Sequence, residues 1–160
     1  MVTARIVKIW TKLFFDREYN EGLYMNALGF KSFEIVEITG EPGGDRTRKI
    51  RTEPKTEAPA VVQKLIGGGI TYTETGRLDA KTGKFDYAIV TSKLSDKIKI
   101  AGQLWVEPRG DDKVERICDV ELHVNIFGVG GAIEKFIAET TRDSYEKTAV
   151  YTNEFIAKKR

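Results

Sequence analysis

The sequence of 160 residues contains one histidine and one cysteine, and this scarcity excludes several kinds of site. A zinc site of the usual type needs several cysteine and histidine ligands, so such a site is nearly excluded. Cys118 has no second cysteine for an internal disulfide, which fits a reducing compartment, and we expect a cytoplasmic protein. Cys118 and His123 lie on one predicted strand, at positions that point to opposite faces, so they cannot form a thiol–imidazole pair.

The sequence also lacks long apolar runs. None approaches the roughly 20 residues that a membrane-spanning helix needs, and the first residues lack the apolar core and cleavage site of a signal peptide. A net charge of +2 is too small to indicate nucleic acid as a partner. With 41% hydrophobic and 31% charged residues, the chain is expected to be a single soluble globular domain over residues 1–160.

The glycine clusters do not match a phosphate-binding loop. Residues 67–69 lead into a predicted strand and lack the Lys-Ser/Thr pair that completes a P-loop. Residues 128–131 precede a predicted helix, but they lack the third spaced glycine of a dinucleotide-binding motif. A tight turn is the better interpretation of each cluster, and we expect no cofactor.

Residues 128–160 carry the longest helical pattern and contain no proline. Charged residues gather on one side at helical spacing, and the opposite side has Ile133 and Phe155 near its two ends. The middle of that opposite side holds Thr141, Ser144 and Thr148, which are small and polar. Such residues indicate either close approach of the helix to a neighbour or a space that a ligand fills, and the helix alone leaves both open.

The remaining segments predict short strands and a few helices. Residues 2–9 predict a first strand, and residues 10–29 predict one or two short helices that end at Gly29. Residues 54–69 indicate a short helix or a mobile flap, with glycines as its exit. Further strands are predicted at residues 30–39, 46–53, 70–78, 84–92, 97–108 and 113–127.

This order of elements predicts an α+β fold. Sequential strands with short connections form an antiparallel meander, and only the C-terminal helix is long enough to cover its apolar face. We therefore expect a helix-grip fold, in which a curved seven-stranded antiparallel sheet surrounds a long C-terminal helix. Two short helices would follow the first strand.

Residues 46–53 form an unusually basic strand, with Arg46, Arg48, Lys49 and Arg51. Charges along a strand are a known protection for the edge of a sheet, and we favour this interpretation. A second possibility is transient contact with the acidic headgroups of a membrane surface, next to the apolar residues of the predicted flap. The group has no interleaved aromatic residues, so a nucleic-acid interface is not expected.

The residues expected to face the helix would form a mostly apolar lining with a few polar points. This composition describes a pocket for a hydrophobic ligand, but also an ordinary core, and it separates the two poorly. Glu74 and Arg116, if both point inward, could pair across the pocket mouth or orient a polar headgroup. The candidate ligand-binding residues are Phe33, Tyr72, Glu74, Tyr87, Ile89, Ile100, Leu104, Arg116, Val120, Leu122, Ile137, Thr141, Ser144, Thr148 and Tyr151.

The chain resembles the START-like helix-grip superfamily, also called SRPBCC or birch-pollen-allergen-like. The resemblance is most specific at residues 24–30, at residues 94–102 and at the junction 123–135, which is followed by Tyr145 and Tyr151. The junction is similar to that of an uncharacterised bacterial family of this superfamily and to that of sterol-handling VASt domains. The resemblance implies a cavity between sheet and helix that binds lipids, sterols, polyketides or plant hormones. The resemblance implies no catalytic residue, because the enzymes of the superfamily share no single motif that matches this sequence.

Three hypotheses for function remain. The first is non-catalytic binding or transfer of a hydrophobic, lipid-like molecule. The second is an enzyme of the polyketide cyclase or hydratase type that uses the same cavity, with Tyr72, Glu74 and Tyr87 as acid–base candidates. The third is a protein-interaction module that uses the convex face of the sheet around Trp105.

Overall fold

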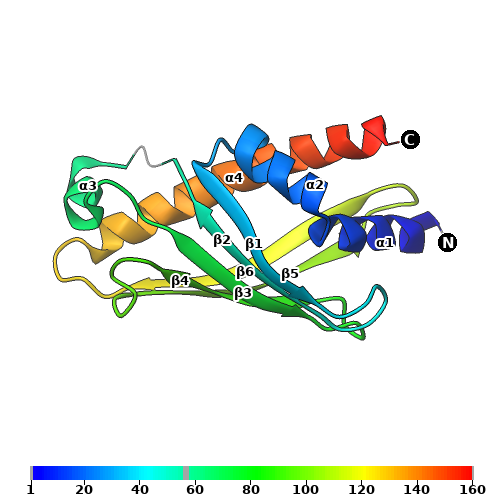
Figure 1. Cartoon of the computed structure of the whole chain (residues 1–160), viewed down its shortest axis with the longest axis horizontal. Coiled ribbons are helices and arrows are strands. Elements are labelled where there is room, and N and C mark those ends of the chain that lie inside the picture. Colours follow the sequence, from blue (N-terminus) through cyan, green and yellow to red (C-terminus); the bar gives the residue numbers. More distant parts are fainter. Residues whose placement is uncertain (1, 56–57, 160) are drawn as a thin grey trace.

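The computed structural model describes residues 2–55 and 58–159, with side chains from residue 8 onward. Four α-helices, one π-helix (η1) and six strands follow one another along these residues (Figure 1). Their bounds are α1 Val2–Phe14, α2 Arg17–Glu21, η1 Gly22–Ala27, β1 Ser32–Thr39, β2 Arg46–Glu53, α3 Ala60–Ile66, β3 Tyr72–Leu78, β4 Phe85–Thr91, β5 Ile98–Pro108, β6 Val114–Val124 and α4 Gly130–Lys158.

The strands form one antiparallel sheet in the order β1-β2-β3-β4-β5-β6, so every strand pairs with its neighbours in the chain. The sheet is curved, and α4 crosses its concave side diagonally (Figure 1). The predicted α+β architecture, with a meander and a C-terminal helix, is confirmed. The predicted number of strands is wrong, because the sheet has six strands and not seven.

The missing strand is the one predicted at residues 2–9, which belong to helix α1. The β-branched residues of this segment favoured a strand, whereas the aromatic residues that follow are spaced for a helix. Trp10 and Phe14 stack with ring centroids 5.3 Å apart, as residues one helical turn apart do. Phe14 then meets Phe85 of the sheet at 4.7 Å. Tertiary packing of this aromatic face therefore outweighs the local β-propensity.

The basic strand β2 is not an edge strand, because it lies between β1 and β3. The interpretation of its charges as edge protection is wrong. Arg48 is 2% exposed and lies on the concave side together with Ile50 and Thr52, which are also buried. On the other side, exposed Arg51 forms an ion pair with Glu34 of β1 at 3.1 Å. The four basic residues therefore do not form a single patch.

The helix expected in residues 54–69 is present as α3, which ends where Gly67 adopts a left-handed conformation with φ of 53°. The side chain of Lys93, from the connection between β4 and β5, donates hydrogen bonds to the carbonyl oxygens of Ile66 and Gly67. Residues 56 and 57, which belong to the predicted flap, lie outside the described residues. α3 is thus fastened to the sheet at its C-terminal end.

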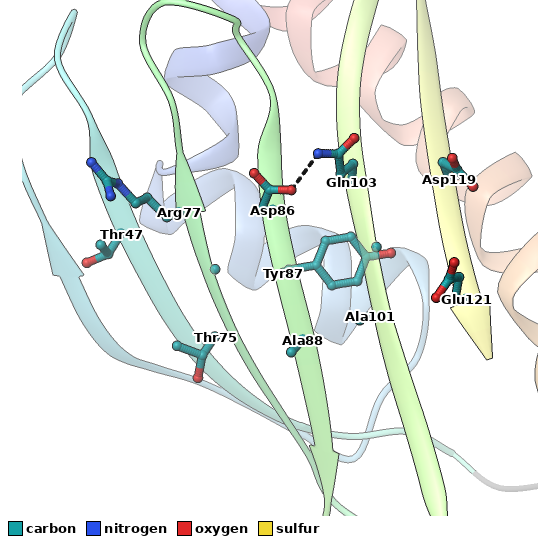
Figure 2. A pocket seen from close by; sticks show the side chains of 12 residues that line it. Thr47, Thr75, Arg77, Asp86, Tyr87, Ala88, Ala101, Gln103, Asp119 and Glu121 are labelled. Atoms are coloured by element: carbon teal, nitrogen blue, oxygen red, sulfur yellow. Dashed lines mark hydrogen bonds between the residues drawn. The ribbon is translucent and has the colours of Figure 1, made fainter. Parts of the chain in front are cut away.

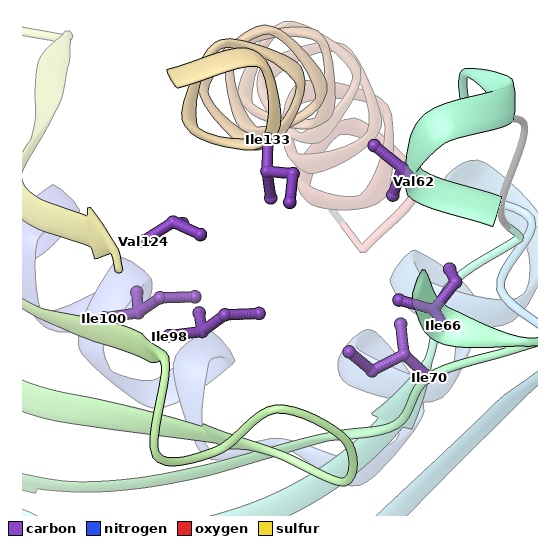
Figure 3. Close-up of a cluster of buried hydrophobic side chains, with 7 residues drawn as sticks. All are labelled: Val62, Ile66, Ile70, Ile98, Ile100, Val124 and Ile133. Atoms are coloured by element: carbon purple, nitrogen blue, oxygen red, sulfur yellow. The ribbon is translucent and has the colours of Figure 1, made fainter. Parts of the chain in front are cut away.

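Two separate apolar clusters fill the two ends of the concave face. At the end near α3, seven buried residues pack together (Figure 3): Val62, Ile66, Ile70, Ile98, Ile100, Val124 and Ile133. At the end near α1, the cluster consists of Trp10, Phe14, Phe15, Leu78, Phe85 and Leu104. We call them the α3 cluster and the α1 cluster. The residues between them form a different kind of surface.

Candidate functional site

The concave face between the two clusters is a row of residues that are paired across the sheet. Arg48 lies opposite Gly76, which lies opposite Tyr87, then Gly102 and Val120. A Cβ atom on Gly102 would lie 3.0 Å from the hydroxyl oxygen of Tyr87. The Tyr87 ring therefore lies across Gly102, close to the sheet. Glycine is required here because any side chain would lift that ring.

Val120 marks an opening at the end of this row. It occupies an inward-facing position of β6, yet 38% of it is exposed, whereas Val124 on the same face is 5% exposed. The helix α4 thus covers the concave face at the α3 cluster and leaves it accessible at Val120. Among the described residues of the candidate lining, Val120 is the one large apolar residue that is exposed.

A buried ion pair closes the opposite end of the row. Nη2 of Arg48 lies 2.7 Å from Oε1 of Glu74, and the side chains are 2% and 16% exposed. Nη1 of Arg48 also donates to the carbonyl oxygen of Phe14 at 2.8 Å and to Oδ1 of Asn20 at 3.2 Å. Burial is the largest influence on the pKa of Arg48 and would lower it, but the electrostatic interactions with Glu74 and Tyr24 and the hydrogen bonds to them together outweigh burial, so the pKa lies above its ordinary value. Arg48 is therefore charged and fully satisfied.

The predicted pairing of Glu74 with Arg116 does not form, since Arg48 takes up the carboxylate. Arg116 is half-buried on the inward face of β6, and its guanidinium lies 4.9 Å from the ring centroid of Tyr145 on α4. Among the described residues, Arg116 has no ion pair and no hydrogen bond from its side chain. Arg48 and Arg116 thus have very different surroundings.

Cys118 lies between two tyrosine hydroxyls. Its Sγ is 3.1 Å from the hydroxyl oxygen of Tyr87 and 2.9 Å from that of Tyr145. Burial raises the pKa of both tyrosines, and the contact with Cys118 adds to the increase. Both hydroxyls therefore remain neutral. This chain of contacts joins the sheet to α4 beside the opening.

Two further tyrosines border the row. Tyr24 of η1 stacks on Phe33 with ring centroids 4.7 Å apart. Burial, and then the charge of Glu74, raises the pKa of Tyr24 to about 12. Burial also raises the pKa of Tyr72. The polar groups of the row are consequently hydroxyls that stay neutral, one satisfied ion pair and Arg116.

The small polar stripe of α4 proves to have two parts. Thr148 is 5% exposed, and its hydroxyl donates to the carbonyl oxygen of Ser144 within the helix at 2.7 Å. One turn later, the hydroxyl of Thr152 lies 2.7 Å from that of Tyr19. This half approaches α2 and η1 closely, so close packing is the correct interpretation at Thr148. Thr141 and Ser144 are only half-buried and lie nearer the opening.

The other candidate residues are distributed over both clusters. Ile89, Leu122 and Ile137 pack against the α3 cluster, which contains Ile100, while Leu104 belongs to the α1 cluster. Tyr151 lies away from the row, where its hydroxyl donates to the carbonyl oxygen of Tyr19 at 3.2 Å.

The candidate residues omit four that shape the row, namely Arg48, Tyr24, Gly102 and Tyr145. The sequence held a signal for Arg48, which alternates with Ile50 and Thr52 on one face of a strand. The other three depend on contacts between distant elements.

Surface hollows lie elsewhere. One of about 700 Å³ follows the convex face, where Asp86, Gln103, Asp119 and Glu121 line it and Nε2 of Gln103 donates to Asp86 at 2.6 Å (Figure 2). Another of about 1250 Å³ lies between α2, η1 and the end of α4. Neither is lined by Thr141, Ser144 or Thr148.

Trp105, which also lies on the convex face, does not form an exposed apolar patch. It is half-buried, its indole N–H donates to Glu107 at 3.0 Å, and Nζ of Lys84 lies 4.6 Å from its ring centroid. Polar groups therefore lie beside the ring, although Ile117 is its cross-strand partner.

Within residues 2–55 and 58–159, no group of three or more histidine, cysteine, aspartate or glutamate side chains is placed to hold a metal ion. No helix in the same part of the chain is both long and apolar enough to span a membrane.

The fold is that of an antiparallel sheet gripping a C-terminal helix, and two solved structures share it. The protein TTHA0849 from Thermus thermophilus is 17% identical, with a TM-score of 0.59 and coverage of 92% of this chain and 86% of that chain. The Zhui aromatase/cyclase from Streptomyces sp. R1128 is 12% identical, with a TM-score of 0.50 and coverage of 91% and 81%. Both are helix-grip proteins, which agrees with the START-like resemblance at the level of fold.

The chain belongs to the family described as "Protein of unknown function (DUF2505)", whose model matches residues 7–156. No curated protein matches the sequence.

Proposed function

We propose that this protein binds a hydrophobic, lipid-like small molecule, without catalysis, between the concave face of the sheet and α4. The observation that carries this proposal is the exposure of Val120, which is 38% exposed at an inward-facing position beside two buried clusters. An apolar side chain that the fold directs inward but leaves uncovered gains free energy when a ligand covers it. The fold shared with an aromatase/cyclase supports a ligand-binding role.

The lining has the composition that such a ligand requires. Apolar side chains of the α3 cluster continue from the opening through Leu122 and Ile100. The half-buried residues Thr141 and Ser144 of α4 lie on the other side and leave more room than leucine or isoleucine would. Pockets for small molecules combine an apolar wall with a few polar points in this way.

The proposal favours binding over catalysis because two of the three acid–base candidates are already engaged. Glu74 is held by Arg48 at 2.7 Å, and Tyr87 contacts Cys118 at 3.1 Å. A general acid or base must reach the substrate with a free proton or lone pair. A cyclase or hydratase would therefore have to rely on Tyr72. Turnover of a polyketide substrate that is lost in Tyr72→Phe would favour the enzyme instead.

The test uses a neutral fluorescent probe, N-phenyl-1-naphthylamine, and a pair of matched variants. Val120→Trp fills the opening, whereas Val90→Trp places the same side chain on the convex face, where Val90 is 59% exposed. We expect the wild type and Val90→Trp to bind the probe alike, and Val120→Trp to bind it at least about 10-fold more weakly, a loss of about 1.4 kcal/mol. A wild type that binds no probe, or equal binding by all three proteins, would contradict the proposal.

We also propose that the molecule touches a membrane surface at the end near α3, where a lipid-like ligand would enter. Phe127, in the connection between β6 and α4, is fully exposed, and Val61 of α3 is 37% exposed. The same end carries Lys64, Lys93 and Lys97 against the acidic residues Asp96 and Glu134, a small excess of positive charge. An exposed aromatic ring flanked by lysines suits a bilayer that contains anionic lipids.

A further inference from the structure

Arg116 differs from Arg48, another inward-facing arginine, in lacking an acceptor. Arg46, a third inward-facing arginine, lies at the α1 cluster, with its guanidinium 4.4 Å from the ring centroid of Phe15. Arg48 has Glu74, a backbone carbonyl and Asn20 as partners. Within the described part of the chain, the guanidinium of Arg116 has no hydrogen-bond or ion-pair partner and lies 4.9 Å from the ring centroid of Tyr145. A guanidinium has several N–H donors in one plane, and a cation–π contact with a ring leaves them available to an acceptor.

The charge of the concave face is consequently unbalanced. The charges of Arg48 and Glu74 cancel, and Tyr24, Tyr87 and Tyr145 are kept neutral by their raised pKa values. Among the described residues, Arg46 and Arg116 therefore each contribute a positive charge without an ion-pair partner, and of the two only Arg116 lies on the strand that carries Val120. A half-buried arginine without an acceptor, beside an aromatic ring, is suited to bind a planar or tetrahedral oxyanion through two hydrogen bonds.

The position of Arg116 relative to Val120 indicates how an elongated ligand would lie along β6. Arg116, Cys118, Val120, Leu122 and Val124 alternate along the inward face of β6. Val120 lies four residues beyond Arg116, or about 13 Å along an extended strand. The apolar α3 cluster, which contains Val124, begins beyond Val120. An anionic group at one end and a hydrocarbon tail at the other would match this order.

We propose that Arg116 binds the anionic headgroup, a carboxylate or a phosphate, of an amphipathic ligand whose hydrocarbon tail covers Val120 and points toward the α3 cluster. This inference rests on the proposed function and names the chemical class of its ligand. Tyr145 is a positioning residue that holds the guanidinium toward the interior. Neutral lipids such as sterols would bind without help from Arg116.

The test compares three probes with the same tail, namely hexadecanoate, monohexadecyl phosphate and hexadecan-1-ol, which displace N-phenyl-1-naphthylamine from the protein. A charge-assisted pair of hydrogen bonds predicts that at least one anion binds wild type about 10-fold to 100-fold more tightly than the alcohol. Which anion binds more tightly distinguishes a carboxylate from a phosphate ligand. In Arg116→Gln the preference should disappear while the alcohol binds as before, and Arg116→Lys should keep part of it.

Arg142→Gln is the matched control, since Arg142 is exposed on α4 and its loss should leave the preference intact. Equal binding of all three probes by the wild type would overturn the role of Arg116 but would not contradict the proposed binding of a hydrophobic ligand. An anion preference that survives in Arg116→Gln would place the anion elsewhere and would also overturn it. Failure of the wild type to bind the neutral probe would instead overturn the proposed function, and this inference with it.

Discussion

The buried ion pair between Arg48 and Glu74 should be a major determinant of stability. In Glu74→Gln the positive charge of Arg48, which is 2% exposed, remains inside the protein without its counter-ion. Breaking a buried pair on one side costs about 3–5 kcal/mol. Since Glu74 itself is 16% exposed, we expect the lower end, about 3 kcal/mol. This is a large part of the roughly 5–15 kcal/mol that stabilises a typical domain.

The two single variants and the double variant form a thermodynamic cycle that tests this expectation. Arg48→Met should cost at least as much as Glu74→Gln, because it leaves Glu74, the Phe14 carbonyl and Asn20 without their donor. The double variant should lose less than the sum, by about 2 kcal/mol, because no lone charge is then buried. Urea unfolding followed by circular dichroism measures all three. Additivity within about 0.5 kcal/mol would refute the reasoning.

Three further predictions concern the packing of α4, the pKa values of the tyrosines and the exposed Phe127. Gly22→Ala would place a Cβ 2.1 Å from the hydroxyl oxygen of Tyr151 and displace its hydrogen bond, so the free energy of unfolding should fall by about 1–2 kcal/mol. Gly131→Ala, where a Cβ meets nothing within 4 Å, is the control and should not destabilise. Five of the six tyrosines have raised pKa values, so the folded protein holds protons that the unfolded chain releases near pH 10. Stability should be complete below pH 10 and fall as the pH rises toward 12, and Tyr24→Phe should remove up to about 2.7 kcal/mol of this dependence; tyrosinate absorbance that rises at pH 10 in the folded protein would argue against it. Phe127→Ser should weaken binding to vesicles of phosphatidylserine and phosphatidylcholine about 10-fold, because the variant has no aromatic side chain at this position to bury in the bilayer. Val150→Ser, at a residue 60% exposed on α4, is the control and should bind vesicles like the wild type. Equal vesicle binding by Phe127→Ser and Val150→Ser would contradict a membrane contact at Phe127.

The sequence was informative wherever periodicity decided the structure. Alternation placed β3 to β6 within a few residues of their observed bounds, and it directed Tyr72, Glu74 and Val120 correctly to the concave side. Helical spacing likewise predicted α4, whose observed bounds are Gly130–Lys158. These elements are long, and each has one apolar face, so local pattern and final environment agree.

The sequence was misleading where a partner distant in the chain decided the structure. For α1, helical spacing was present in the sequence at Val2, Ile6, Trp10 and Phe14, but the β-branched residues of segment 2–9 concealed it when that segment was considered without the residues that follow. The contact of Phe14 with Phe85 was not visible in the sequence. The charge of Arg48 indicated an exposed edge, but Glu74 and Asn20 allow it to be buried. The approach of Tyr87 to Gly102 depends on strand register, which the sequence does not specify to the required accuracy.

The central claim is that the accessible stretch of the concave face at Val120 receives a lipid-like ligand, and native mass spectrometry of gently purified protein tests it most directly. We predict an additional mass that is lost on denaturation and that extracts into organic solvent as an amphipathic, anionic molecule. Val120→Trp should lack this mass, and Val90→Trp should retain it. Wild-type protein that carries no ligand, and takes up neither hexadecanoate nor hexadecan-1-ol when they are added, would contradict the account.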